Sequence, residues 1–271
     1  MSRLSADIDD RIRTGARLTW FTFAAPANFY RLAGWLAPAC AVAAALLALA
    51  GLWTGLFVAP SDATQGEVYR IIFIHVPAAW LSMVLYVAMA GWAAIGWFLN
   101  ARMAFMLARA IAPTGALFAL LALWTGSLWG RPTWGTWWVW DARLTSELIL
   151  LFLYLGYMAL VAAIDDTRRA DKAGALLAIV GVVNVPVIYF SVIWWNTLHQ
   201  GSSLTMGAAP KMASTMLLAM LLLTFACWFY AFAVVFVRAR AIVLEREGGT
   251  AWARALLAPT AGLAPRGKQG T

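Results

Sequence analysis

The chain has 271 residues, of which 63% are hydrophobic and 12% are charged, and its mean hydropathy is +0.77. Soluble domains are about half apolar and about a quarter charged, so this composition excludes an ordinary soluble protein and indicates a polytopic membrane protein. The formal net charge of +8 has two possible origins, attraction to nucleic acid or a sided membrane topology. Its distribution along the chain decides between them.

We expect no cleavable signal in the amino-terminal region, because residues 1–31 lack a compact apolar core followed by a small-residue cleavage site. Its second half, residues 17–31, has aromatic side chains between basic ends and a central Pro26. We expect this segment to lie in the inner membrane interface ahead of the first span. Residues 1–32 are therefore predicted to form a cytoplasmic and interfacial tail.

Six apolar runs follow, each long enough to cross about 30 Å of hydrocarbon as a helix. Strands are excluded, since the runs are continuous and lack the alternating polarity of a membrane barrel. In the fifth run, Asn184 and Pro186 are expected to produce a kink, because proline removes a backbone donor. We predict a single all-α membrane domain, with a core of six transmembrane helices at 33–237 and a cytoplasmic tail at 238–271. The six runs lie at residues 33–58, 72–99, 104–128, 146–164, 173–195 and 213–237.

Basic residues are concentrated in alternate connections between these runs. This excess places both termini in the cytoplasm and the other three loops outside. The positive charge is therefore explained by the orientation of the chain in the membrane and by attraction to anionic lipids. It gives no support for nucleic-acid binding. The two tails and the loops at 100–109 and 165–172 hold 16 of the 20 Lys and Arg residues, and the remaining 4 are Arg70, Arg131, Arg143 and Lys211.

The outer loop between the third and fourth spans is rich in tryptophan, since residues 129–141 read WGRPTWGTWWVWD. Indole rings have flat apolar faces and one N–H donor, which suits contact with the rim of a large flat ligand at a membrane surface. The alternative is an aromatic belt of the kind that marks membrane interfaces, although a belt does not normally concentrate so many indoles in one short loop. The candidate ligand-contacting tryptophans are Trp129, Trp134, Trp137, Trp138 and Trp140.

The chain has only two histidines, and the predicted topology puts both on the outer side with the tryptophan loop. His75 lies at the outer start of the second span, and His199 lies just beyond the outer end of the fifth. Two neutral imidazoles suit the two axial positions of one haem iron, with the tryptophans holding the porphyrin. The alternatives are interfacial histidines without a ligand, or zinc, for which a third protein ligand is missing on that face.

Charged residues near the loop each allow two interpretations. Arg131 and Arg143 suit pairing with haem propionates or with lipid phosphates. Asp141 suits the rim of the site or the N-cap of the fourth span, for which Thr145 and Ser146 are alternatives. Glu147 suits the first turn of that helix. The span interiors otherwise lack the charged residues expected of a proton relay or an ion pathway. A nucleophile–base pair cannot be assembled, so we do not expect an enzyme.

Two other functions stay open beside a haem-handling protein. A membrane cytochrome b would use a bis-histidine haem for electron transfer, but such proteins generally carry histidines within their spans, often for haems on both sides. A secondary transporter of another small molecule would be expected to have intramembrane charges and internal repeats, and neither is apparent in the sequence.

Three segments resemble a known family of haem-handling membrane proteins. The stretch WGTWWVWDARLTSELILLFLYLGY, from Trp134 onward, resembles the tryptophan-rich signature of that superfamily. IFIHVPAAW around His75 and NTLHQGSS around His199 resemble the histidine motifs of one branch, the haem exporter protein C of cytochrome c maturation system I. The likeness extends from residue 29 through the sixth span.

This resemblance implies site residues, a role and partners. A family member would bind haem b non-covalently at the periplasmic face, with His75 and His199 as axial ligands and the loop from Trp129 to Asp141 against the haem. It would deliver the haem to a periplasmic, membrane-anchored haem chaperone. It would work in the bacterial inner membrane beside an ABC transporter, made of an ATPase and a membrane subunit, and a very small single-span membrane protein.

Overall fold

The computed structural model describes residues 25–195, 197–199 and 212–257. Within these ranges the chain is helical, and its strand-like pairing is confined to an isolated bridge between Asp62 and Gly66. Six helical segments are long and apolar enough to cross a membrane, which confirms the predicted all-α fold with six transmembrane helices. The segments are Pro26–Val58, Glu67–Leu99, Arg102–Trp134, Ala142–Ala163, Thr167–Trp194 and Ser214–Glu247.

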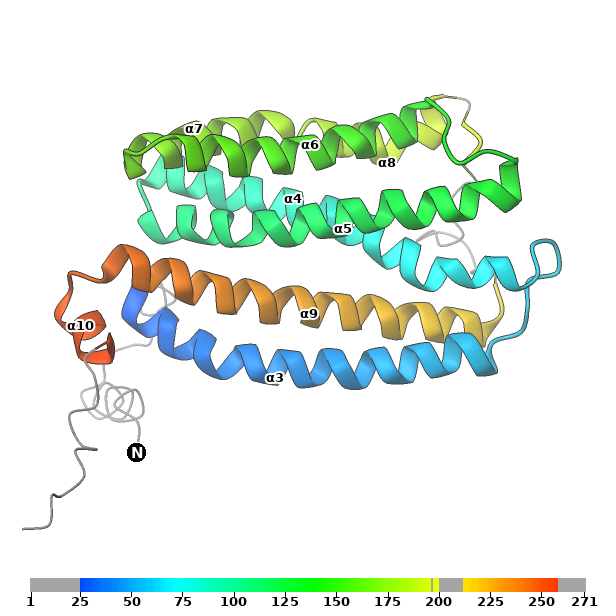
Figure 1. The fold of residues 1–271 in the computed structure, drawn as a ribbon, viewed down its shortest axis with the longest axis horizontal. Helices are drawn as coiled ribbons and strands as arrows, with labels where there is room; N and C mark the ends of the chain where they lie inside the picture. Colours follow the sequence, from blue (N-terminus) through cyan, green and yellow to red (C-terminus); the bar gives the residue numbers. More distant parts are fainter. Residues whose placement is uncertain (1–24, 196, 200–211, 258–271) are drawn as a thin grey trace, which may run out of the picture.

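These segments lie side by side with their long axes roughly parallel (Figure 1). Helices α3 and α9 pack together along their length, and α4 and α5 form a second closely packed pair. Helices α6, α7 and α8 cover that second pair on the side away from α3. In chain order the elements are α3 (Pro26–Trp53), the π-helical turn η1 (Thr54–Val58), the short 3-10 helix η2 (Glu67–Ile71), α4 (Ile72–Leu99), α5 (Arg102–Trp134), α6 (Ala142–Ala163), α7 (Thr167–Gly181), α8 (Asn184–Trp194), α9 (Ser214–Glu247) and α10 (Ala251–Leu257).

The two ends of the bundle carry different connections. At one end, on the right in Figure 1, lie the connection from α3 to α4, the loop at 135–141 and the residues that follow α8. At the opposite end lie the start of α3, the connections from α4 to α5 and from α6 to α7, and α10. His75 and His199 therefore lie at the same end of the bundle as the tryptophan-rich segment, as the alternation of the spans predicts.

Helix ends follow local sequence signals. Asp141 is the N-cap of α6, where its Oδ1 accepts a hydrogen bond from the Leu144 N–H at 2.8 Å, so the capping interpretation of Asp141 is confirmed. Asp166 caps α7 in the same way. Gly135 ends α5 with a φ of 78°, a left-handed conformation that glycine adopts without a Cβ penalty.

The fifth span is broken at the position where the sequence predicts a kink. Helix α7 ends at Gly181 and α8 begins at Asn184. Pro186 has no N–H for the carbonyl of Val182, four positions earlier, so a regular helix cannot continue through this point. The Asn184 side-chain amide donates to the Ser146 carbonyl at 2.9 Å, which ties the break to α6.

Several helices extend beyond the predicted runs, most clearly at the start of the first span, the end of the third and the end of the sixth. The expected interfacial segment at 17–31 is already part of the transmembrane helix α3 from Pro26 onward, because proline is favourable in the first turn of a helix. The sixth helix continues from residue 237 to Glu247, because Ala239 and Val243 are fully buried against the core. Residues 1–24 and 258–271 of the predicted tails lie outside the described residues.

Candidate functional site

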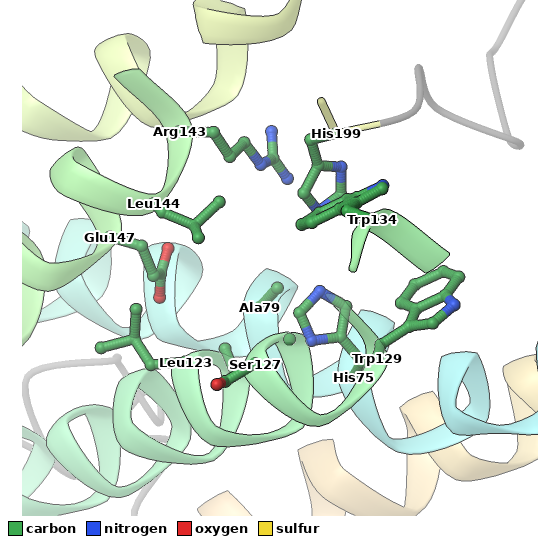
Figure 2. A pocket seen from close by; sticks show the side chains of 12 residues that line it. His75, Ala79, Leu123, Ser127, Trp129, Trp134, Arg143, Leu144, Glu147 and His199 are labelled. Atoms are coloured by element: carbon green, nitrogen blue, oxygen red, sulfur yellow. The ribbon is translucent and has the colours of Figure 1, made fainter. Parts of the chain in front are cut away.

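A pocket lies at the histidine-bearing end of the bundle, between α4, α5, α6 and the residues that follow α8 (Figure 2). The space between the lining side chains is about 500 Å³ when its opening to solvent is included. Its walls combine two imidazoles, two indoles and two charged side chains with apolar groups. The lining residues are His75, Ala79, Ala122, Leu123, Gly126, Ser127, Trp129, Trp134, Arg143, Leu144, Glu147 and His199.

His75 is buried in the first turn of α4, with 8% of its surface exposed. Its Nδ1 lies 3.0 Å from the Thr125 hydroxyl oxygen. That hydroxyl donates its own proton to the Leu121 carbonyl at 2.6 Å, so it accepts from His75 Nδ1–H. The resulting tautomer leaves a lone pair on Nε2, which is the form of imidazole that binds metals.

Helix α5 fixes the ring of His75 from two further positions. A Cβ at Gly126 would lie 3.0 Å from His75 Cε1, so the imidazole occupies the space that a larger residue would take. The Trp129 indole meets the imidazole edge to face, with ring centroids 5.7 Å apart. Trp129 is in turn held by a hydrogen bond from its Nε1 to Gln65 Oε1 at 2.7 Å. Trp129 therefore positions His75 as well as lining the pocket.

His199 faces His75 across the pocket, with ring centroids 6.0 Å apart (Figure 2). Trp134 lies beside His199, at a centroid separation of 6.0 Å. The two histidines come from α4 and from the segment after α8, so they meet only in the folded bundle. The NTLHQGSS segment around His199 lies mostly outside the described residues, but His199 itself is described.

Two charged side chains of α6 also line the pocket. Arg143 reaches toward His199 and donates from one guanidinium nitrogen to the Ile188 carbonyl at 3.1 Å (Figure 2). Glu147 is buried, with 7% of its surface exposed, and accepts a hydrogen bond from the Ser82 hydroxyl at 2.8 Å. The expectation that Glu147 lies in the first turn of its helix is wrong, because α6 begins at Ala142 and Glu147 is in the second turn.

The tryptophan-rich segment is divided between helix and loop. Trp129, Arg131 and Trp134 belong to the last turns of α5, so the predicted loop from 129 to 141 is corrected to 135–141. Pro132 does not end the helix, which continues to Trp134, and the Thr133 hydroxyl donates to the Trp129 carbonyl at 2.7 Å within this turn. The helical turn aims Trp129 and Trp134 into the pocket.

The remaining residues of this segment do not line the pocket walls. Trp137 and Trp140 are 54% and 76% exposed, and Trp138 packs edge to face on Trp140 at 5.3 Å. Asp141 caps α6, and Arg131 donates to the Gly135 carbonyl at the end of α5. The loop is nevertheless adjacent to the pocket, because Ser127, a lining residue, donates to the Trp137 carbonyl at 2.9 Å.

Sequence reasoning missed four residues that build this site: Gln65, Ser82, Thr125 and Gly126. One signal was available, because Thr125 and Trp129 are four residues apart and therefore share a helix face once α5 is extended to Trp134. Gln65 and Ser82 had no comparable signal, since their partners Trp129 and Glu147 are distant in sequence. Arg70 lies outside the pocket and ties η2 to the end of α3 by donating to the carbonyls of Gly55 and Ala59.

A sequence profile described as heme exporter protein C matches residues 19–254. The chain is 52% identical over 185 residues to the "Heme exporter protein C" of Escherichia coli (strain K12), covering 68% of this chain and 76% of the relative. It is 44% identical to the protein of the same name from Haemophilus influenzae, covering 86% and 95%. A "Putative cytochrome c biosynthesis ccmC-like mitochondrial protein" of Marchantia polymorpha is 44% identical, covering 72% and 82%.

Proposed function

Because the chain belongs to the heme exporter protein C family, we propose that it binds haem in the pocket between His75 and His199 and delivers it for cytochrome c maturation. The names of the relatives refer to haem export and, for the Marchantia protein, to cytochrome c biosynthesis. In this proposal haem is the transported cargo and the chain is a transfer protein rather than an enzyme.

The observation that carries the proposal is the facing pair of imidazoles. The ring centroids of His75 and His199 are 6.0 Å apart, which leaves room for one metal atom bound to a nitrogen of each ring, given metal–imidazole bonds of roughly 2 Å. Thr125 holds Nδ1 of His75, so Nε2 is the ligating nitrogen. Two neutral imidazoles complete the axial coordination of a haem iron.

The rest of the pocket suits a flat ligand with an apolar body and acidic substituents. Ala79, Ala122 and Leu144 supply apolar wall, and Gly126 adds no side chain beside His75. The indoles of Trp129 and Trp134 supply aromatic surface. Arg143 supplies a guanidinium that pairs with a haem propionate.

In this proposal, the residues of the tryptophan-rich segment that do not line the pocket lie at the solvent-exposed edge of the haem. Part of the cargo must stay accessible if it is to be transferred, and the exposed Trp137 and Trp140 border that side. Trp138, Arg131 and Asp141 support them, through the ring contact with Trp140 and the hydrogen bonds that end α5 and begin α6.

The cellular setting follows from the charge distribution and the family. Both termini lie in the cytoplasm and the pocket faces the periplasm of a bacterial inner membrane, because the basic residues are concentrated in the opposite connections. The haem b is bound non-covalently and passes to a periplasmic, membrane-anchored haem chaperone. An ABC transporter with its ATPase and membrane subunit, and a very small single-span protein, complete the assembly.

An absorption spectrum of the purified full chain with added haem b tests the ligand assignment. We expect a six-coordinate, bis-histidine spectrum, which His75→Ala and His199→Ala each abolish. Trp124→Phe is the matched control, because Trp124 is on α5 and 62% exposed, and it does not line the pocket. Unchanged spectra in both histidine variants would contradict the proposal.

A further inference from the structure

The axial ligands do not explain why a buried acidic side chain lines the pocket. Among the described residues that line the pocket, one is acidic, and that residue is Glu147. Its carboxyl group lies in the part of the pocket near Leu123 (Figure 2). A buried carboxylate without a full charge partner is costly, so its position calls for a physical reason. Haem carries two carboxylates of its own, which makes a carboxylate in the same pocket unfavourable unless the two are kept apart.

Helix α4 and the core hold Glu147 in place. The Ser82 hydroxyl donates to Glu147 Oε1 at 2.8 Å, and the Ser82 carbonyl accepts from the Tyr154 hydroxyl at 2.8 Å. Ser82 and Tyr154 are both fully buried. The carboxyl group is therefore fixed at one side of the pocket by a connected set of hydrogen bonds.

Arg143 places the opposite charge at a different part of the same pocket. It lies four residues before Glu147 on α6, so the two side chains share a helix face. Its guanidinium extends toward His199, whereas the Glu147 carboxyl lies nearer Leu123 (Figure 2). Apolar residues such as Ala79, Ala122 and Leu144 complete the walls around these two charges. The pocket thus carries a positive group toward His199 and a negative group toward Leu123.

We propose, on the basis of the haem-binding function above, that Glu147 orients the haem within the pocket. Haem has both propionates on one edge, so rotation about the axis between the two histidines moves that edge from one side of the pocket to the other. Repulsion by the Glu147 carboxylate excludes the propionates from its side, and attraction by the Arg143 guanidinium retains them at the other. Glu147 is a positioning residue that selects one of the rotated arrangements.

Paramagnetic proton NMR of the ferric complex at pH 8 measures this orientation, since each arrangement gives its own set of haem methyl signals. The ligand is dimethyldeuterohaem, which keeps both propionates and has identical faces, so that face reversal adds no signals. We expect one set of signals from the wild-type protein. Glu147→Gln keeps an acceptor for Ser82 but removes the charge, and a second set should then rise to roughly a tenth or more, a tenfold change in ratio being about 1.4 kcal/mol.

Two controls separate charge from hydrogen bonding. Ser82→Ala keeps the carboxylate and removes its hydroxyl partner, so we expect a single set of signals. The dimethyl ester of the same haem has no propionate charge, so we expect several sets even in the wild-type protein. A single set in Glu147→Gln, or a second set in Ser82→Ala, would overturn the orienting role of the charge. A wild-type protein that gives no bis-histidine spectrum would instead overturn the proposed function.

Discussion

The two ends of the helix bundle use charged residues in different ways. At the end opposite the histidines, Asp171 and Arg246 form a two-point ion pair at 2.6 and 2.7 Å, and both side chains are only 9% exposed. Arg102 pairs there with Glu247 at 2.6 Å. At the histidine end, the pocket residues of α6 make hydrogen bonds to neutral groups instead of close ion pairs, because Arg143 donates to a carbonyl and Glu147 accepts from a hydroxyl.

This difference separates charges that hold the fold from charges that meet a ligand. Ion pairs that neutralise each other fix the packing of helices, and their net contribution depends on both partners being present. Charged groups that line a cavity beside neutral partners keep their electrostatic effect for a bound molecule. The ion pairs at the opposite end therefore hold the fold, whereas the pocket charges at the histidine end are candidates for ligand contact.

Breaking the buried ion pair should give the largest effect on stability. Arg246→Met leaves Asp171 without its counter-charge, so we expect a loss of about 3–5 kcal/mol in the free energy of unfolding. Unfolding in detergent measures it, and haem affinity of the folded fraction should not change. The double variant Asp171→Leu with Arg246→Met should lose much less, because no unpaired charge remains. A large loss of haem affinity in Arg246→Met would remove the distinction between the two ends.

Filling the space beside His75 should affect the histidine end next most strongly. In Gly126→Val the new Cβ lies 3.0 Å from His75 Cε1, so the imidazole must shift, at a cost of roughly 1–3 kcal/mol. We expect haem affinity, measured by spectral titration, to fall at least about tenfold. Gly91→Val is the control, since a Cβ at Gly91 meets nothing within 4 Å. Equal haem affinity in the two variants would contradict the placement of His75.

Removing the hydroxyl that holds His75 should give a smaller loss. Thr125→Val conserves the shape of the side chain but removes the acceptor for Nδ1–H, so haem affinity should fall roughly tenfold. Thr125→Ser retains the hydroxyl and should bind haem as the wild-type protein does. Wild-type affinity in Thr125→Val would show that the tautomer of His75 does not depend on this contact.

The exposed end of the tryptophan segment should contribute least to equilibrium binding. Trp140 is 76% exposed and does not line the pocket, so Trp140→Ala should change stability and haem affinity by less than about 0.5 kcal/mol. The same titration measures the affinity. A tenfold weaker complex would place Trp140 in direct contact with the haem, and the boundary of the site would then have to include the loop at 135–141.

The number of spans, the break in the fifth span and the common location of His75, His199 and the tryptophan segment could all be predicted from the sequence. These features depend on local properties, such as runs of apolar residues, a proline and the alternation of connections. The capping role of Asp141 was also predictable, because an N-cap is set by residues only three positions apart.

The inner structure of the site was not predictable in the same way. The contacts of Trp129 with Gln65 and of Glu147 with Ser82 join residues far apart in the chain, and no spacing rule connects them. The predicted loop at 129–141 is longer than the observed one, because Gly130 and Pro132 indicate a loop whereas α5 stays helical to Trp134. That error concealed which indoles face the pocket.

Near-infrared magnetic circular dichroism of the ferric haem complex tests the central claim most directly, because the energy of the charge-transfer band identifies both axial ligands. We expect the band of a low-spin haem with two neutral imidazoles in the wild-type protein. His75→Ala and His199→Ala should each lose it. A wild-type band typical of one imidazole with a different second ligand would contradict the assignment of His75 and His199 as the pair that holds the iron.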